Sequence, residues 1–442
     1  MNSDSNAFTQ YLQLRGKDSA AATGVPETLN GHAADALAAI ASHPDSDIFA
    51  PDYGVNLGHL PMQADLATSF RCGVPQLNSL LAVVANDVFY PTENLYRNAP
   101  EGLYAGSIRT LPEQFAADAA SMLETGISDS DAPALVNSLL LHDGVYIRVE
   151  KGAEVEKPVQ IVNIFNSDIP LLTPRRVLIH AMAGSRIRVL LCDHSQTPAT
   201  AHLNSQIVQV KVEADASVEL YDIEESSAAT TRYWQLFAEQ ADGSHLTVNT
   251  CYLTGGKTVN TYRISCGNNT DTSLSGLVIA SGTENVTNRV DLRHTGTGAT
   301  SKQLFKSALF DKSRGTFKGN IYVAEGAART DASQSCRNLL ASADARMVSE
   351  PQLEIYCDDV KCSHGATTGQ LDERALFYMQ TRGVPVEEAR NMLTQAFMAD
   401  VIDNISFEVL RQRMHILVEK RLSGATADCS SCAAACHAQS TE

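Results

Sequence analysis

The chain has 442 residues, of which 51 are acidic and 34 are basic, so its formal net charge is −17. This acidic balance argues against a nucleic-acid-binding protein, because contacts to phosphates need a basic surface. Hydrophobic residues make up 44% of the chain, which is an ordinary share for a folded protein and excludes general disorder. A chain of this length has room for two or three domains.

The first residues, MNSDSNAFTQYLQLRG, contain no apolar stretch of the kind found in secretory signal peptides. No apolar run in the chain approaches the roughly 20 residues that are needed to cross a bilayer. We therefore expect a soluble cytoplasmic protein that binds no membrane. Its ten cysteines are then expected to be reduced thiols rather than disulfides.

Residues 1–139 are predicted to form an N-terminal helical region. An Ala-rich segment that begins near Asn30 has helical composition. A second apolar segment, VPQLNSLLAVVANDVFY, ends before Pro91.

Residues 140–371 change to an alternation of apolar and polar residues with a period of two, which is typical of strands. One strand–turn–strand pattern ends at Val155, Ile187 and Val218, in steps of 32 and 31 residues, and a weaker copy ends at Leu246. Strand–turn units that recur every 20–50 residues indicate a solenoid. We therefore predict a β-helix core; a β-sandwich with regular hairpins is the alternative.

Residues 372–424 are predicted to form a C-terminal helical domain. Asp372 can cap a first helix that ends at Gly383 in the left-handed conformation. Pro385 suits the first turn of a second helix, and Ser406 can cap a third. The predicted fold is thus mainly β, with a β-helix core flanked by helical segments on both sides.

The segment 425–442 is predicted to be a flexible Cys-rich tail of small and polar residues. It holds Cys429, Cys432, Cys436 and His437 within nine residues, enough donors to enclose one zinc ion or an iron–sulfur cluster. A tail that binds no metal is the alternative that we favour, because the intervening alanines offer nothing to orient the ligands.

Gly255-Gly256-Lys257-Thr258 resembles the end of a phosphate-binding P-loop. The earlier glycine that the motif requires is replaced by Cys251. Both flanks alternate as strands, so no helix N-terminus follows to receive a phosphate. We therefore predict a tight turn between two strands and no bound nucleotide.

The strongest candidate for a functional site lies in the stretch PQLEIYCDDVKCSHGATTG. If residues 357–364 are extended, Cys362 and His364 point to one face and Cys357 points to the other. Thiolate and imidazole both bind iron and zinc, but a closed site usually takes four ligands. The site would therefore be transient, or a second chain would complete it. From spacing alone, the alternative is a buried cysteine beside a hydrogen-bonded histidine with a structural role.

The segments SRGTFKGNIYV, CRNLLAS, PQLEIYCDDVKCSHGAT and LFYMQTRGV lie between Thr295 and about Ile405. They resemble the SufB/SufD family of iron–sulfur cluster assembly proteins. DGVYIRVEKGAEVEKPVQIV, near residue 143, is similar to the start of the family's β-helix. Gly365 replaces a glutamate that is typical of SufB, and the usual N-terminal cysteine motif of SufB is not present, so the chain resembles the SufD branch.

The resemblance implies a scaffold subunit that is neither an ATPase nor another enzyme. It implies that the β-helix pairs with a SufB-like paralogue and that the C-terminal helices bind a SufC-like ATPase. Without its partner, the chain could form a homodimer. A transient iron–sulfur cluster or iron would be shared between the subunits, held by a partner cysteine and by the histidine that matches His364. Cys362 would lie beside it, and Cys357 is assigned to packing.

Two other classes of function are left open. A β-helix can be a carbohydrate-active enzyme, but such enzymes need clustered carboxylates. The neighbouring Asp358 and Asp359 would point to opposite faces of a strand and could not share a substrate. The second alternative is a structural β-helix interaction protein without a metal site.

Overall fold

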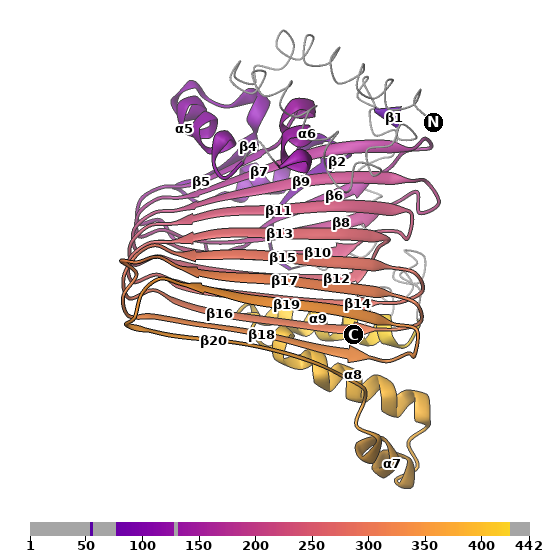
Figure 1. The fold of residues 1–442 in the computed structure, drawn as a ribbon. Helices are drawn as coiled ribbons and strands as arrows, with labels where there is room; N and C mark the ends of the chain where they lie inside the picture. The colour runs from indigo at the N-terminus through magenta and orange to yellow at the C-terminus, as the bar shows by residue number, and fades with distance from the viewer. Residues whose placement is uncertain (1–53, 56–76, 128–130, 425–442) are drawn as a thin grey trace, which may run out of the picture.

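The computed structural model describes residues 54–55, 77–127 and 131–424. Two sheets of mostly parallel strands lie face to face and form the walls of a solenoid, in which each coil contributes one strand to each sheet (Figure 1). The predicted mainly β fold with a β-helix core is confirmed.

Sheet A contains β1 (Gly54–Val55), β4 (Leu103–Ser107), β5 (Val145–Val149), β7 (Leu171–Ala181), β9 (His202–Val212), β11 (Thr230–Gln240), β13 (Lys257–Cys266), β15 (Asn285–His294), β17 (Arg314–Val323) and β19 (Arg346–Ile355). Sheet B contains β2 (Leu80–Ala85), β3 (Val88–Pro91), β6 (Val159–Phe165), β8 (Arg186–Ser195), β10 (Ser217–Glu225), β12 (His245–Thr254), β14 (Asp271–Ala280), β16 (Thr300–Leu309), β18 (Thr330–Leu340) and β20 (Val360–Gly369).

The predicted sequence repeat corresponds to the coils themselves. Parallel pairing places Ile187 of β8 beside Val218 of β10, and Val218 beside Leu246 of β12. All three side chains are buried in the core between the sheets. The alternation of apolar and polar residues therefore builds continuous apolar rows inside the solenoid, and their removal from water stabilises each coil on the next.

The segment that resembles a P-loop is a tight turn, as predicted. Gly255 and Gly256 join β12 to β13, and no helix follows. A Cβ atom on Gly256 would lie 2.4 Å from the carbonyl oxygen of Ala228 and 2.5 Å from that of Thr230. Only glycine allows the backbones of the two coils to approach this closely.

Part of the region that was expected to be helical is β-structure instead. β2 and β3 form an antiparallel hairpin at one edge of sheet B, and β4 pairs with β5 in sheet A. The β2 segment LLAVVA is almost entirely buried, so it lacks the alternation that distinguishes a strand from a buried helix. The sheets therefore begin before residue 139. The Ala-rich segment near Asn30 lies outside the described residues.

Helices in this region cover the outer face of sheet A at its N-terminal strands (Figure 1). They are the 3₁₀ helix η3 (Ile108–Thr110), α5 (Glu113–Glu124) and α6 (Ala132–Leu140). The short helix α4 (Glu93–Asn98) packs instead against β2 of sheet B, and its Leu95 is buried in the core between the sheets. No helix in the described ranges is long and apolar enough to cross a membrane.

The C-terminal helices are α7 (Glu373–Thr381), α8 (Val386–Ile402) and α9 (Glu408–Leu422). Apolar side chains of α8 and α9, including Met398 and Met414, pack on outward-facing residues of sheet B such as Leu190 and Ile223. In addition, Nζ of buried Lys306 donates to a carboxylate oxygen of Asp400. α8 and α9 are thus fixed to the sheet, whereas α7 stands away from it (Figure 1).

Of the four predicted helix signals, Asp372 and Gly383 agree with the structure, and Pro385 is the N-cap residue directly before the first turn of α8. The side chain of Asp372 accepts a hydrogen bond from the N–H of Arg374, and Gly383 has a φ of 87° just after α7. The predicted cap at Ser406 is wrong, because Phe407 is the N-cap of α9. The hydroxyl of Ser406 donates instead to Glu219 of β10, and this bond ties the start of α9 to the sheet.

A charged network lies inside the solenoid, on the same inward-facing positions as the apolar rows. Arg232 donates to both carboxylate oxygens of Asp222 at 2.8 Å and to Asp193 at 2.7 Å. Arg175 lies 3.6 Å from Asp193, and Glu224 accepts hydrogen bonds from neighbouring hydroxyls. Burial raises the pKa of Glu224 to about 8, although Arg232 opposes the shift. When Glu224 is neutral, the charged members of the network are two carboxylates, Asp193 and Asp222, and two guanidinium groups, Arg175 and Arg232.

We expect Glu224 to make the free energy of unfolding depend on pH. Between about pH 4.5 and 8 this carboxyl is protonated in the folded chain and ionised in the unfolded chain, so stability falls as pH rises. Glu224→Gln removes this dependence and should gain about 2–4 kcal/mol relative to the wild type between pH 5 and pH 8. Urea unfolding at both pH values measures the difference. The exposed Glu325→Gln serves as control, and an unchanged pH dependence in Glu224→Gln would contradict the assignment.

Candidate functional site

β20 carries both predicted ligands and is the last strand of sheet B. It pairs with β18 on one side, and no strand among the described residues pairs with its other side. β19 is the corresponding last strand of sheet A. The final coil therefore presents two unpaired strand edges, at the end of the solenoid opposite the N-terminal hairpins (Figure 1).

His364 continues a row of inward-facing glutamine side chains. Parallel register places Gln303, Gln334 and His364 side by side on β16, β18 and β20. Nε2 of the buried Gln334 donates to Oε1 of Gln303 at 2.7 Å. A Cβ atom on Gly319 of sheet A would lie 2.4 Å from this nitrogen, so Gln334 spans the interior to the opposite wall.

At His364 the same row reaches the open end of the solenoid. No further coil of the described chain covers the imidazole, and the residue is exposed. Its ring makes no hydrogen bond or ion pair with the described part of the chain. The structure therefore gives no support to the alternative of a hydrogen-bonded structural histidine.

Cys362 lies two residues before His364 on the same face of β20, beside Ala332 of β18. Its half-buried side chain packs against an apolar cluster that includes Ile321, Val323 and Ala332. Burial raises the pKa of the Cys362 thiol, although a backbone hydrogen bond from Ala332 opposes the shift. The thiol is therefore protonated at neutral pH, and a metal ion that binds it must displace this proton.

Cys357 packs, partly buried, against the same cluster as Cys362. The expectation that it points to the opposite face is wrong, because β20 begins only at Val360 and Cys357 lies in the preceding turn. Asp358 and Asp359 are exposed in this turn and do not line the cleft between α7 and α8. They offer no support for a carbohydrate-active site.

Cys362 and His364 together present one sulfur and one ring nitrogen at the uncovered end of the β-helix. In the described ranges, no group of three or more His, Cys, Asp or Glu side chains is arranged to hold a metal ion. A tetrahedral site needs four ligands, so further donors must come from outside these residues. Cys429, Cys432, Cys436 and His437 lie outside the described residues.

Comparison with known families agrees with this architecture. The model of the SufBD core domain of the SUF system for FeS cluster assembly matches residues 164–397, and that of the SufBD N-terminal region matches residues 45–161. The chain belongs to the SufB/SufD family. The predicted family is therefore confirmed, and with it a general role in iron–sulfur cluster assembly.

Individual relatives agree with the SufD branch. The chain is 37% identical over 175 residues to iron–sulfur cluster assembly protein SufD of Escherichia coli (strain K12), which covers 39% of this chain and 41% of the relative. It is 26% identical over 302 residues to SufD of Bacillus subtilis, with 65% and 66% covered. It is 28% identical over 331 residues to the chloroplastic protein ABCI7 of Arabidopsis thaliana, with 71% and 68% covered. The match thus spans less than half of the Escherichia coli relative.

The polar residues inside the solenoid were not predicted from the sequence. Gln303, Gln334 and His364 recur at steps of 31 and 30 residues, which match the lengths of the coils. Asp193 and Glu224 likewise lie 31 residues apart and pair directly. An alignment of the repeats that tracked polar as well as apolar positions would have found both sets.

We expect the Cys362 thiol to react slowly with iodoacetamide in the isolated, metal-free chain. Its raised pKa leaves less thiolate at pH 7.5 than an unfolded cysteine has, so alkylation should be several-fold slower than in urea-unfolded chain. The rate should rise steeply above about pH 9. Peptide mass spectrometry over time measures the rate at this residue. Alkylation at the same rate in folded and unfolded chain at pH 7.5 would contradict the assignment.

Proposed function

We propose that the chain is a non-catalytic scaffold subunit of a cytoplasmic SUF-type assembly complex. In this proposal, the open end of its β-helix pairs with a SufB-like subunit, and a nascent iron–sulfur cluster forms at the junction. The observation that carries the proposal is a thiol and an imidazole, those of Cys362 and His364, on an unpaired strand edge, with no third donor arranged beside them among the described residues.

The unpaired edges support a partner of similar construction. Edge strands leave N–H and C=O groups free, and such edges are used for strand addition between chains. β19 and β20 offer one edge to each sheet, so another β-helix could continue both sheets. The same geometry would allow two copies of this chain to pair when the partner is missing.

The ligand chemistry supports a cluster that is shared between chains. Iron accepts both thiolate and imidazole, and a cysteine from the partner would add the donor that the described residues lack. Because Cys362 is held by the apolar cluster and His364 by the β18–β20 pairing, both donors are oriented before the partner arrives.

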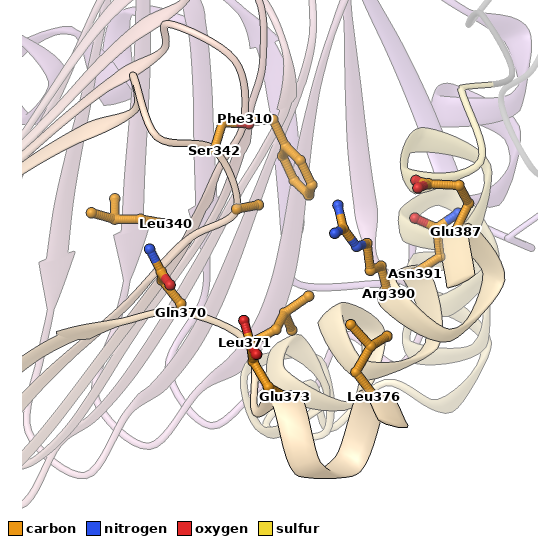
Figure 2. A pocket seen from close by; sticks show the side chains of 11 residues that line it. Phe310, Leu340, Ser342, Gln370, Leu371, Glu373, Leu376, Glu387, Arg390 and Asn391 are labelled. Atoms are coloured by element: carbon orange, nitrogen blue, oxygen red, sulfur yellow. The ribbon is translucent and has the colours of Figure 1, made fainter. Parts of the chain in front are cut away.

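The C-terminal helices are the proposed docking surface for a SufC-like ATPase. On α7, Phe377 is 67% exposed and Tyr378 is 58% exposed, although both are large and apolar. A cleft of about 340 Å³ lies between α7, α8 and the ends of the neighbouring strands, with Leu376 and Arg390 at its wall (Figure 2). Exposed aromatic side chains beside a charged cleft are typical of protein interfaces.

We expect His364→Ala to reduce cluster assembly in cells at least about tenfold, because loss of a metal ligand weakens binding by one or more orders of magnitude. The complex with its partners should still form, since the exposed ring makes no hydrogen bond or ion pair with the described residues that the substitution would remove. Cluster content and co-purification are the two measurements. Cys362→Ala should have a milder effect, and Ser363→Ala, exposed on the same strand, is the matched control.

Full cluster assembly by the His364→Ala complex would defeat the site assignment and favour a structural interaction protein. Loss of the complex itself would show that the residue acts in docking rather than as a ligand.

The double variant Phe377→Asp/Tyr378→Asp should weaken ATPase co-purification at least tenfold, because charged groups replace the exposed aromatic surface. Removal of all three helices would uncover the apolar face of sheet B, so substitutions on α7 are the cleaner test. Tyr96→Asp/Ile169→Asp places the same charges at exposed positions outside the C-terminal helices and is the matched control. Undiminished ATPase binding by the α7 variant would place the docking surface elsewhere.

A further inference from the structure

The outer face of sheet A carries more positive than negative charge, although the chain as a whole is acidic. Side chains that point outward alternate along each strand with core residues such as Val290 and Phe317. On β13, β15, β17 and β19 these outward positions hold seven lysine or arginine residues and three aspartate or glutamate residues. The whole chain has 51 acidic and 34 basic residues. The outward positions of these four strands therefore form a basic face on an acidic protein.

The basic face is open on its outer side in the described part of the chain. α5 and α6 contact β7 and β9, and α8 and α9 lie on the opposite wall, against sheet B (Figure 1). No described helix lies over β15, β17 or β19. Arg293, Arg314, Lys318 and Arg346 are accordingly exposed. Their charged groups can be reached by a partner that approaches from this side.

Two arginines lie side by side on the basic face without a carboxylate between them. Parallel register places Arg314 of β17 next to Arg346 of β19, at the strand spacing of about 4.8 Å. Nη1 of Arg346 donates to the backbone carbonyl oxygens of Ala343 and Ala345. No carboxylate among the described residues forms an ion pair with either arginine. Like charges on neighbouring strands repel each other, so a carboxylate supplied from outside would relieve this repulsion.

A second pair of neighbouring cations lies further along the same strands. Arg289 of β15 lies next to Lys318 of β17, and Lys318 follows Arg314 by about 13 Å along the strand. Glu350 offsets part of this charge, because its carboxylate lies 2.9 Å from Nζ of Lys318. The positive charge thus extends over the face, and it is least compensated at Arg314 and Arg346.

The other side chains of the basic face favour a protein partner over a nucleic acid. The guanidinium group of Arg293 lies 4.9 Å from the ring centroid of Tyr322, whose ring lies 5.5 Å from that of Tyr356. Arginine and tyrosine are enriched in protein interfaces. Glu350 and Glu354 lie among the cations, and their carboxylates would repel a continuous row of phosphates. Separate acidic side chains on a protein surface can avoid these positions.

We propose that the basic face of sheet A binds the acidic surface of a partner protein. Arg314 and Arg346 each donate to one carboxylate of this partner, in the bidentate geometry that a planar guanidinium group favours. The basic face points away from sheet B, which the C-terminal helices cover, and it is distinct from the strand edges at the open end. The partner is therefore a third one, in addition to the proposed SufB-like subunit and SufC-like ATPase.

Fluorescence anisotropy of a labelled glutamate decapeptide with the purified full chain tests the proposal. We expect binding at about 20 mM NaCl that weakens at about 300 mM NaCl, because salt screens exposed charges. Arg314→Glu/Arg346→Glu should weaken the binding at least about tenfold. Arg97→Glu/Arg186→Glu is the matched control, since it changes the net charge equally at exposed positions away from the basic face. The control should change the affinity by less than about twofold.

The single variant Arg346→Glu separates loss of binding from loss of folding. A glutamate at this position would lie next to Arg314 and pair with it, so the urea midpoint of unfolding should rise. The same variant should bind the peptide several-fold more weakly, because one cation is lost and the other is paired within the chain. Weaker binding by a chain that is more stable cannot result from unfolding.

Three results would overturn the proposal. Absence of peptide binding at low salt would show that the basic face does not bind acidic groups. An equal loss of binding in the Arg97→Glu/Arg186→Glu control would show that net charge alone acts. Tighter binding of a labelled thymidine decanucleotide than of the peptide, lost in Arg314→Glu/Arg346→Glu, would make the face a nucleic-acid surface. None of these measurements involves Cys362 or His364, so their outcome is independent of the proposed role in cluster assembly.

Discussion

The fold depends on the in-register stacking of inward-facing side chains from one coil to the next. The row Ile187, Val218, Leu246 shows the principle, because each residue covers its predecessor and is covered in turn. Parallel strands supply the hydrogen bonds between coils, but the burial of these rows sets which residues lie opposite each other. A coil without a successor consequently keeps an uncovered row. The candidate site is made from that uncovered row, and its exposure follows directly from its position at the end of the stack.

The end of the stack also explains why Cys362 and His364 have no third donor side chain arranged beside them in the described part of the chain. A strand in the middle of the solenoid has neighbours on both sides and would bury a histidine at the position of His364, as it buries Gln334. On β20 the pairing with β18 places His364 in register with Gln334, but no further strand of the described chain covers its imidazole. Pro351 of β19, which has no N–H to donate, lies on the other free edge, a position in which proline is tolerated. The uncovered end of the solenoid is therefore suited to bind a surface that is not part of these coils.

The sequence predicted the solenoid well because its strongest signal, the 31–32-residue recurrence, is the signal that builds the fold. It predicted the strand with Cys362 and His364 on one face, since two residues of the same parity share a face in any strand. The sequence did not predict β2 as a strand, because its apolar run lacks the alternation of apolar and polar residues that marks a strand. It also failed at Ser406, whose hydroxyl is taken by Glu219, a residue 187 positions earlier. A contact across that separation leaves no local pattern. The same is true of Arg232, whose three carboxylate partners lie on other strands.

α8 and α9 lie across several coils and are fastened to more than one of them. Asn249 of β12 donates to the carbonyl oxygen of Val401, Lys306 of β16 holds Asp400, and Arg421 holds Glu284 before β15. An inserted coil between β12 and β16 would move these anchor points apart by about 4.8 Å while the helix that spans them keeps its length. Most solenoids lengthen during evolution by duplicating a repeat. In this protein the helices fix the distance between the strands that they contact. The number of coils between these contacts therefore cannot change unless the helices change as well.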